Sequence, residues 1–303
     1  MIQTPPTPMR LAPLRLAIGI ATRGRAAVLA EMLTEVRAQT LAPDRILICG
    51  TEPADIQGLP DGPPDNLEMF LAPAGLPRQR NAILQRAGDC DLLLFLDDDF
   101  LMAPGYVAAT VAAFAGHADL VGTTGIAIAD DARGPGLSVA AGRALIAEDP
   151  DAAAAGLERA PHGYGCNMAV RLDTVRQNGL RFDERLPLYA WSEDIDFTHR
   201  LARHGWLAKL HGARGVHLGV KEGRTPGRRL GYSQVANPIY LFGKGSYSFG
   251  RAARSVGRNM AMNALRSFQP EGYIDRRGRL RGNALALLDL VRGRLAPERI
   301  LDL

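Results

Sequence analysis

The chain has 303 residues, of which 47% are hydrophobic and 22% are charged, and this composition indicates a folded globular protein rather than a disordered one. No apolar stretch reaches the roughly 18 to 20 residues that a membrane-spanning helix needs, so the sequence predicts no span. The net charge of +4 is unevenly distributed: residues 1–220 carry 20 basic and 26 acidic side chains, whereas residues 221–303 carry 16 basic and 6 acidic ones. A basic tail favours an anionic partner such as a lipid headgroup, a lipid-linked pyrophosphate or nucleic acid.

The N-terminal segment has four prolines and no long apolar run, so we expect residues 1–13 to be a flexible leader rather than a secretory signal. Cys49, Cys90 and Cys166 lie far apart and match no metal-ligand or disulfide spacing, which indicates buried thiols in a reducing compartment. Cytoplasmic residence is the default expectation, and the basic tail leaves peripheral attachment to the inner face of the cell membrane open.

Short apolar runs alternate with helical stretches through the first half of the chain, which is the pattern of βαβ units. We expect strands at 14–20, 45–49, 67–71 and 91–96, and helices at 26–38, 78–87 and 104–115. The Gly- and Ala-rich sequence from about 120 to 165 predicts loops and short elements that frame a second substrate. A strand at 167–171, a short helix at 172–178 and a helix capped by Ser192 follow. The predicted fold class is α/β, with a Rossmann-like, mostly parallel sheet and helices on both faces.

Three consecutive aspartates, Asp97, Asp98 and Asp99, directly follow the central apolar strand. Ligands of open parallel sheets bind beyond the carboxyl ends of the strands, which is where this triplet lies. Adjacent carboxylates repel one another, and a hard divalent cation such as Mg²⁺ or Mn²⁺ would compensate their charge. Aspartate is also common in solvated turns, so the triplet alone fits either a metal site or a turn. Thr22 and Arg23 follow the first strand and would bring a hydroxyl and a guanidinium to the same edge, where a nucleotide is a natural occupant.

Two further groups are candidates for chemistry. Glu193 and Asp194 open a predicted helix, where acidic side chains also simply favour the positive end of the helix dipole. Tyr189 and Trp191 lie just upstream and would place an aromatic wall beside these carboxylates, a combination typical of sugar-binding sites that would raise a carboxylate pKa toward that of a general base. His217 lies between apolar residues and is either a packed histidine or a cation ligand beside two carboxylates.

The ordered set of these motifs resembles that of glycosyltransferases of the GT-A fold, family 2. The resemblance covers about residues 14–220 and rests on Thr22-Arg23, Arg80-Asn81, the Leu-Asp-Asp-Asp at 96–99, and the segments 165–171, 182–184 and 193–196 with Arg200. Each segment is short, but the order is specific. It implies a GT-A type fold and a single inverting displacement that moves a sugar from a nucleotide-diphosphate donor to a hydroxyl acceptor.

The resemblance also implies roles for individual residues. Asp97 and Asp99 match the family's DxD motif, so Asp99 would be the main ligand of a divalent Mn²⁺ or Mg²⁺ ion and Asp97 would face the nucleotide as well. Asp98, between them, is grouped with the donor-binding residues without a defined role. Asp194 matches the general base that deprotonates the acceptor, with Glu193 beside it.

The nucleotide-binding segment departs from the family pattern at one point. Thr22 and Arg23 match the segment that contacts the nucleotide, and Arg80 lies where the family places a residue near the base or phosphates. Family members commonly have an aspartate after the second strand that recognises the base, whereas this chain has Glu52 at a shifted position. Either Glu52 substitutes for that aspartate or the base is recognised differently. UDP is the favoured donor nucleotide, with GDP or dTDP as alternatives.

Residues 221–303 lie mostly outside the resemblance and are predicted to form a basic, mainly helical C-terminal extension. We expect amphipathic helices at 250–268 and 283–295 and a dense basic cluster at 276–281. Arg251, Arg254 and Arg258 repeat on one helix face, which favours attachment to an anionic membrane surface where a lipid-linked acceptor would be displayed. Alternatively, the helices cover the catalytic domain or form a homodimer contact. Nucleic-acid binding is a weaker choice, because aromatic residues are few.

The function that the sequence predicts is a metal-dependent, inverting glycosyltransferase of exopolysaccharide, lipopolysaccharide or glycolipid assembly, with a glycan or lipid-linked acceptor. A sugar-phosphate nucleotidyltransferase also has a nucleotide-binding α/β sheet and uses Mg²⁺, but this chain lacks the glycine-rich, lysine-bearing N-terminal loop of such enzymes. A non-catalytic sugar-nucleotide- or glycan-binding protein of the same fold is a third hypothesis. The pairing of Asp97 and Asp99 with Glu193 and Asp194 argues against it.

Overall fold

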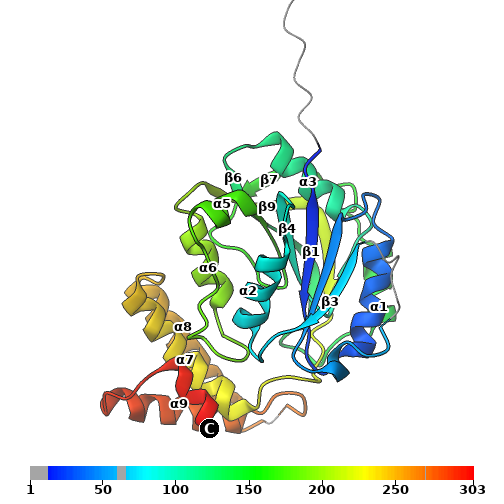
Figure 1. The fold of residues 1–303 in the computed structure, drawn as a ribbon. Helices are drawn as coiled ribbons and strands as arrows, with labels where there is room; N and C mark the ends of the chain where they lie inside the picture. The colour runs from blue at the N-terminus through cyan, green and yellow to red at the C-terminus, as the bar shows by residue number, and fades with distance from the viewer. Residues whose placement is uncertain (1–12, 60–65, 270) are drawn as a thin grey trace, which may run out of the picture.

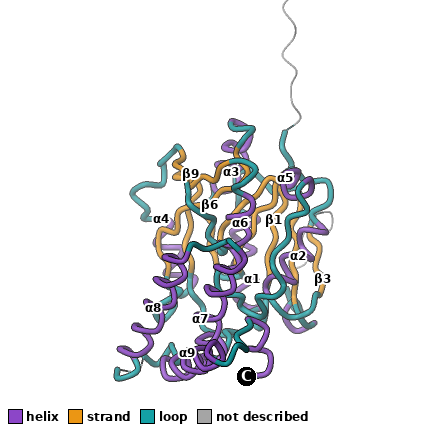
Figure 2. The backbone as a smooth tube through the Cα atoms, turned by 90° about the vertical axis from the view of Figure 1, so that its left-hand side faces the viewer, coloured by secondary structure: helices purple, strands orange, loops and turns teal. Residues whose placement is uncertain are grey.

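The computed structural model describes residues 13–59, 66–269 and 271–303, and Figure 1 shows their fold. All but the last residue of the predicted leader at 1–13 lies outside the described residues. A central sheet carries helices on both sides, and a group of C-terminal helices lies beside this body (Figures 1 and 2).

The nine strands of the described fold form one sheet in the order β3-β2-β1-β4-β8-β6-β9-β5, with β7 paired to β9. Their bounds are β1 Leu16–Ala21, β2 Arg45–Gly50, β3 Leu67–Leu71, β4 Leu92–Asp97, β5 Phe100–Met102, β6 Leu120–Asp130, β7 Leu157–Arg159, β8 Asn167–Arg171 and β9 Trp206–His217. Strands β1 to β4 are parallel to one another and β6 is parallel to β9, whereas β8, β5 and β7 run antiparallel to the strands with which they pair. The predicted mostly parallel α/β sheet is therefore confirmed.

Side chains of β4 alternate between two hydrophobic clusters, because successive residues of a strand point to opposite faces. Leu94 and Leu96 pack with α1, α3 and α4 on one face, and Leu93 and Phe95 pack with α2, α5 and α6 on the other. These helices are α1 Ala26–Arg37, α2 Leu76–Arg86, α3 Tyr106–Gly116, α4 Val139–Ala147, α5 Leu172–Gln177 and α6 Glu193–Leu201. The three cysteines are buried free thiols, as the sequence predicts.

Two long strands correct the sequence interpretation. The segment predicted as loops and short elements contains the short helix α4 and strand β7, but also the 11-residue strand β6, and the region before His217 forms the 12-residue strand β9. The sequence of β6 is rich in Gly, Ala and Thr and gives little apolar signal, yet β6 pairs with β8 on one side and β9 on the other. Leu120 and Val121 contribute apolar side chains to the two clusters, and pairing on both sides buries the Gly and Thr residues that follow them.

The C-terminal extension is helical, as predicted, and consists mainly of α7 Gly227–Lys244, α8 Phe249–Arg266 and α9 Arg276–Val291, with a final 3₁₀ helix at Pro297–Asp302. Helix α8 matches the prediction, but α9 begins before the expected start at residue 283. Helix α7 is not predicted, because its glycines and the internal Pro238 give a low helix propensity. Packing stabilises it instead, since Tyr232 and Val235 are buried in a cluster with Ala286 of α9 and Ile300.

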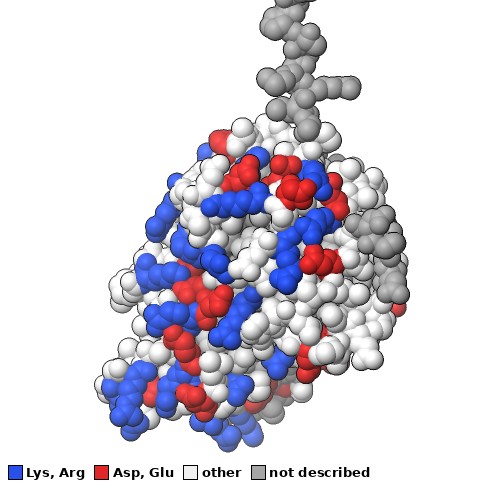
Figure 3. All heavy atoms as spheres, viewed as in Figure 1, with Lys and Arg blue, Asp and Glu red and all other residues white. Residues whose placement is uncertain are grey.

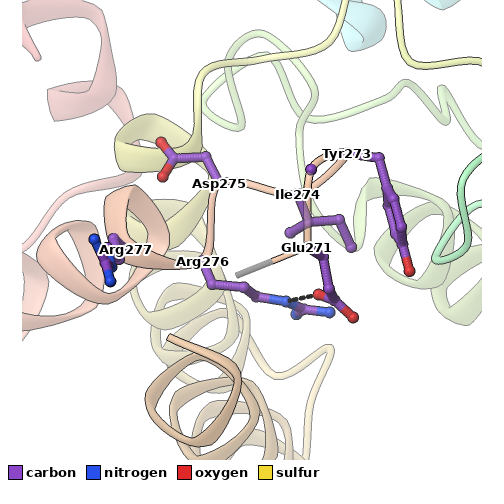
Figure 4. A pocket seen from close by; sticks show the side chains of 7 residues that line it. Glu271, Tyr273, Ile274, Asp275, Arg276 and Arg277 are labelled. Atoms are coloured by element: carbon purple, nitrogen blue, oxygen red, sulfur yellow. Dashed lines mark hydrogen bonds and ion pairs between the residues drawn. The ribbon is translucent and has the colours of Figure 1, made fainter. Parts of the chain in front are cut away.

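The turn that leads into α9 lines an open pocket of about 350 Å³ (Figure 4). Arg276 Nε donates to Glu271 Oε2 across it at 2.6 Å. Of the predicted basic cluster at 276–281, Arg276 is thus paired, whereas Arg277 and Arg281 are exposed. None of the helices in the described parts of the chain combines the length and apolar character required to cross a lipid bilayer.

Close contact between α7 and α9 gives a stability prediction. A Cβ atom added at Gly231 of α7 would lie 2.0 Å from the carbonyl oxygen of Arg279, so Gly231→Ala forces the two helices apart. We expect a loss of about 1–3 kcal/mol in the free energy of unfolding, measured by urea denaturation followed by circular dichroism. The matched control is Gly243→Ala on the same helix, where no atom lies within 4 Å of the added Cβ. That change should be neutral or stabilising by about 0.5–1 kcal/mol. Equal stability of the two variants would contradict the prediction.

Candidate active site

Asp97, Asp99 and His217 meet at the carboxyl end of β4. Each of the three residues offers one ligand atom, and these atoms all lie within 4.8 Å of one another. His217 Nε2 is 3.3 Å from Asp99 Oδ1 and 3.8 Å from Asp97 Oδ2. Asp99 Oδ1 is buried without a hydrogen-bond partner among the described residues. A buried carboxylate oxygen that accepts no hydrogen bond and lies beside a second carboxylate and an imidazole fits a hard divalent cation, so the donor set suits Mg²⁺ or Mn²⁺.

Asp130 orients His217 toward these carboxylates. Asp130 ends β6 and pairs with His217 in the parallel register of β6 and β9. Its Oδ1 atom lies 2.9 Å from His217 Nδ1, and its Oδ2 atom accepts from the Tyr164 hydroxyl at 2.7 Å. Burial lowers the pKa of His217. The carboxylates of Asp130 and Asp99 outweigh this effect and raise that pKa to about 10 when no ion is bound. A carboxylate on the far nitrogen of a histidine ligand is the usual second partner at metal sites. Asp130 is not predicted from the sequence, because the long strand β6 that carries it lies in the segment expected to form loops and short elements.

Asp98 points into the protein rather than toward the edge of the sheet. It is 4% exposed, and its carboxylate accepts from the Thr22 hydroxyl and from Arg25 Nη1, both at 2.8 Å. Burial and the charge of Asp99 raise the pKa of Asp98 to about 6, against the effect of Arg25. The structure thus places Asp98 and the Thr22 side chain, both predicted to contact the nucleotide, in contact with each other. This link fixes the loop after β1 to the triplet.

Arg25 joins the triplet to the loop that follows β9. Its Nη1 atom is 3.6 Å from Asp99 Oδ2, and its guanidinium donates to the carbonyl oxygens of Glu222 and Val220. In the same loop, Val220 N donates to Asp99 Oδ2, and the cations Lys221 and Arg224 donate to backbone carbonyls. Arg25, Lys221 and Arg224 are not predicted from the sequence, because no local motif places them beside Asp99.

Arg80 lies beneath the site and connects its two halves. The side chain is 2% exposed, with Nη1 donating to Glu193 Oε1 at 2.5 Å and Nη2 to Asp97 Oδ1 at 3.2 Å. Nη2 also donates to the Gly165 carbonyl at 2.6 Å. Burial disfavours the charged guanidinium, but Glu193 and Asp97 outweigh it and raise the pKa of Arg80. Arg80 therefore supports the carboxylates from inside the protein, and its expected position near the base or phosphates stays a prediction.

Glu193 and Asp194 differ in their environments. Glu193 is 5% exposed; burial raises its pKa well above the usual value, although Arg80 favours the charged form. Asp194 is half-buried, and its Oδ2 atom accepts from the Gly165 amide at 3.0 Å. Because Gly165 bonds to Asp194 through its N–H and to Arg80 through its C=O, it connects Asp194 to the guanidinium that also contacts Asp97. Of the pair, Asp194 is the carboxylate that remains accessible.

The segment that carries Tyr189 and Trp191 has a strained backbone. Among the described residues, the non-glycine residues with positive φ are Leu188 at 58°, Ala190 at 53° and Ser192 at 73°. Such conformations cost on the order of 1–3 kcal/mol each and persist only where packing enforces them. Ser192 precedes α6, but its side chain makes no capping bond, which corrects the expected N-cap and follows from its left-handed backbone. Tyr189 and Trp191, with ring centroids 6.3 Å apart, are thereby fixed just before the Glu193-Asp194 pair.

The remaining candidates lie on loops at the same edge of the sheet. Arg23 and Glu52 are exposed. A carboxylate that we did not predict, Asp55, is 1% exposed and accepts from the backbone amides of Gly24, Thr51 and Glu52. Asp55 therefore joins the loops after β1 and β2, and both of its oxygens are occupied.

Comparisons with known proteins agree with the fold. No protein-family model and no curated protein matches this sequence. Among solved structures, the mannosyltransferase PcManGT from Pyrobaculum calidifontis, in complex with GDP-Man and Mn²⁺, matches with a TM-score of 0.57 and 16% identity, over 97% of this chain and 88% of its own. GalNAc-T7 with UDP, GalNAc and Mn²⁺ matches with a TM-score of 0.58 and 14% identity, over 95% of this chain and 56% of its own. A structure of S. aureus TarS matches with a TM-score of 0.56 and 12% identity, over 93% of this chain and 82% of its own. At these identities the likeness establishes the fold, which is the α/β fold of GT-A glycosyltransferases.

The buried position of Arg80 predicts a large effect on stability. Arg80→Met should lower the free energy of unfolding by about 3–5 kcal/mol, because it leaves Glu193 buried without its cation. Adding Glu193→Gln should recover part of this loss. The control, Arg78→Met, changes a side chain on the same helix that is 47% exposed, and should stay within about 0.5 kcal/mol of the wild type. Urea denaturation measures all three. A loss that Glu193→Gln does not reduce would show that the ion pair is not its cause.

The metal-ligand geometry predicts specific stabilisation by Mn²⁺. At a concentration about 100 times its Kd, the ion should stabilise the protein by about 2.7 kcal/mol and raise Tm in a thermal-shift assay, reversibly with a chelator. Asp99→Asn should abolish the shift, while Asp173→Asn, at a carboxylate that is 65% exposed, should leave it intact. An unchanged response in Asp99→Asn would refute this ligand set.

Proposed function

We propose that this protein is a metal-dependent, inverting glycosyltransferase that moves a sugar from a nucleotide-diphosphate donor to a hydroxyl acceptor. The observation that carries the proposal is the connection of Asp97 to Asp194 through Arg80 and Gly165. This connection holds a carboxylate suited to a metal-bound diphosphate and an accessible carboxylate suited to proton abstraction in one rigid arrangement. The fold and the Mn²⁺ complexes of two similar structures support it.

The donor diphosphate would bind at the edge of the sheet, where Asp97, Asp99 and His217 would hold the divalent ion. When bound, this ion supplies Lewis-acid stabilisation of the charge that develops on the leaving diphosphate. Lys221 and Arg224 lie on the loop after β9, whose Val220 amide donates to Asp99, and they add positive charge to the same region. Such preorganised charge stabilises the transition state of group transfer.

Asp194 would act as the general base. It takes the proton of the acceptor hydroxyl while the acceptor oxygen forms a bond to the anomeric carbon and the bond from that carbon to the diphosphate oxygen breaks. The nucleoside diphosphate leaves with the bonding electron pair, and one displacement inverts the anomeric centre. Glu193 is unsuited to this task, because it is buried against Arg80. Its role would be to position Arg80 and, through it, Asp97.

The donor and acceptor are proposals of chemical class. UDP is the first choice of nucleotide and GDP or dTDP the alternatives; the similar structures contain GDP-Man in one case and UDP in another. Because the oxygens of Asp55 are occupied by backbone amides, exposed Glu52 is the available carboxylate for the base in this loop. Tyr189, which is 51% exposed, and Trp191 would form the acceptor side for a glycan or lipid-linked acceptor in polysaccharide or glycolipid assembly.

Substitution of the proposed base tests the mechanism. UDP-, GDP- and dTDP-linked sugars are incubated with the protein and Mn²⁺, and the released nucleoside diphosphate is measured. Asp194→Asn should reduce turnover by about 10² to 10⁴-fold, because a general base contributes about that much. Thermal stabilisation by the donor should remain, since Asp194 does not face the diphosphate in this scheme.

The matched control is Asp173→Asn, which should turn over the donor like the wild type. Turnover by Asp194→Asn at the wild-type rate would refute the assignment of the base. Pyrophosphate release from a nucleoside triphosphate and a sugar phosphate would instead identify a nucleotidyltransferase. Donor binding without turnover, even with oligosaccharide and lipid-linked acceptors present, would indicate a binding protein.

A further inference from the structure

Helix α8 has an outer face that the rest of the described structure does not cover. Its inner side packs toward the other C-terminal helices: Ala252 and Asn263 are buried, and Val256 and Met260 are half-buried. The opposite side carries residues at intervals of three or four, which places them on one face of the helix. We define the outer face of α8 as Arg254, Arg258, Met262 and Leu265, with Phe268 after it.

This outer face combines positive charge with exposed apolar side chains. Helix α8 contains four arginines and no acidic residue. Arg254 and Arg258 are exposed and make no ion pair within the described residues. Leu265 is 71% exposed and Phe268 is 84% exposed, although side chains of this kind are usually buried. Lys and Arg side chains also gather over the C-terminal helices in the space-filling view (Figure 3).

We propose that the outer face of α8 docks the protein onto an anionic lipid membrane surface. A helix with arginines and large apolar side chains on its free side lies in the plane of a lipid interface, with the apolar groups among the acyl chains and the cations at the headgroups. The 16 basic and 6 acidic side chains of residues 221–303 add long-range attraction to anionic lipid.

Charge complementarity distinguishes this occupant from a second copy of the chain. In a symmetric dimer through α8, Arg254 and Arg258 would face the same arginines of the other copy, and like charges without acidic partners repel. Single-stranded nucleic acid would need aromatic platforms for successive bases, whereas the aromatic residues here stand at the two ends of the helix. An anionic membrane matches both the charge and the apolar groups.

The packing of α8 also relates this surface to the candidate active site. Ala252, in the first turn of α8, lies in one hydrophobic cluster with Leu186 and Ala190 of the strained segment. Helix α7, which packs against α8, donates from Asn237 Nδ2 to the carbonyl of Trp191 at 3.1 Å. A membrane bound by α8 would thus hold the protein through the two helices, α7 and α8, that pack against the segment of Tyr189 and Trp191.

Vesicle co-sedimentation of the full chain tests the proposal, with vesicles of phosphatidylcholine alone and of phosphatidylcholine mixed with phosphatidylglycerol. The wild type should bind the anionic vesicles and be released by salt. Arg254→Glu with Arg258→Glu should weaken binding at least about tenfold, given the contribution of each basic residue near an anionic surface. Leu265→Ser with Phe268→Ser should weaken binding to anionic vesicles without removing the salt dependence.

The control for overall charge is Arg133→Glu with Arg203→Glu. It changes the net charge by the same amount as the α8 charge variant, at two exposed arginines outside the C-terminal extension. This variant should bind like the wild type. Equal losses in the control and the α8 charge variant, or equal binding to both vesicle types, would overturn the proposal. So would a wild-type dimer in light scattering that the α8 variants convert to monomer, or a protein that binds single-stranded DNA but no vesicles. Unchanged circular dichroism and Tm would show that the variants are folded.

Discussion

The buried guanidinium of Arg80 is the interaction on which the arrangement of the candidate site depends. It comes from α2, yet it contacts Asp97 at the end of β4, Glu193 at the start of α6 and the carbonyl of Gly165 before β8. A charge in this position is stable only because carboxylates and a carbonyl surround it. The ring centroids of Phe95 and Phe182 lie 5.6 and 5.5 Å from Arg80 Cζ, so the two rings cover the rest of the guanidinium. Three segments far apart in sequence are thus fixed by one side chain.

The C-terminal extension acts as a brace for the other side of the site. Asp196 of α6 is fully buried and accepts from Lys244 Nζ at 2.9 Å and from Ser246 Oγ at 2.5 Å. Asp183 likewise accepts from Tyr240 and Lys244 of α7. These contacts hold the strained stretch between them, since a left-handed backbone at Leu188, Ala190 and Ser192 needs external support. The extension therefore supports the candidate site and also carries the outer face of α8.

How far the sequence predicted the site depends on whether a residue's partners are local. Asp97 and Asp99 were predictable, because an apolar strand that ends in carboxylates delivers them to the binding edge of a parallel sheet. Asp130 was not, since its partner His217 is a neighbour only through the pairing of β6 with β9. Arg25 was missed for the same reason, as its partners are the triplet and the loop after β9. Ser192 shows the converse: a local capping pattern was overridden by the backbone that tertiary packing imposes.

The sequence by itself determined the α/β class, most strand and helix positions in the first half, and the carboxylate pairs around which the site is built. These follow from local periodicity and from residue types whose chemistry is the same in any context. Only the tertiary structure decided the burial and the neighbours of each member. It separated buried Glu193 from accessible Asp194, turned Asp98 inward to Thr22 and Arg25, and placed Arg80 in the interior beneath the site. The physical reason is that burial and the identity of neighbouring charges arise between segments that only folding brings together.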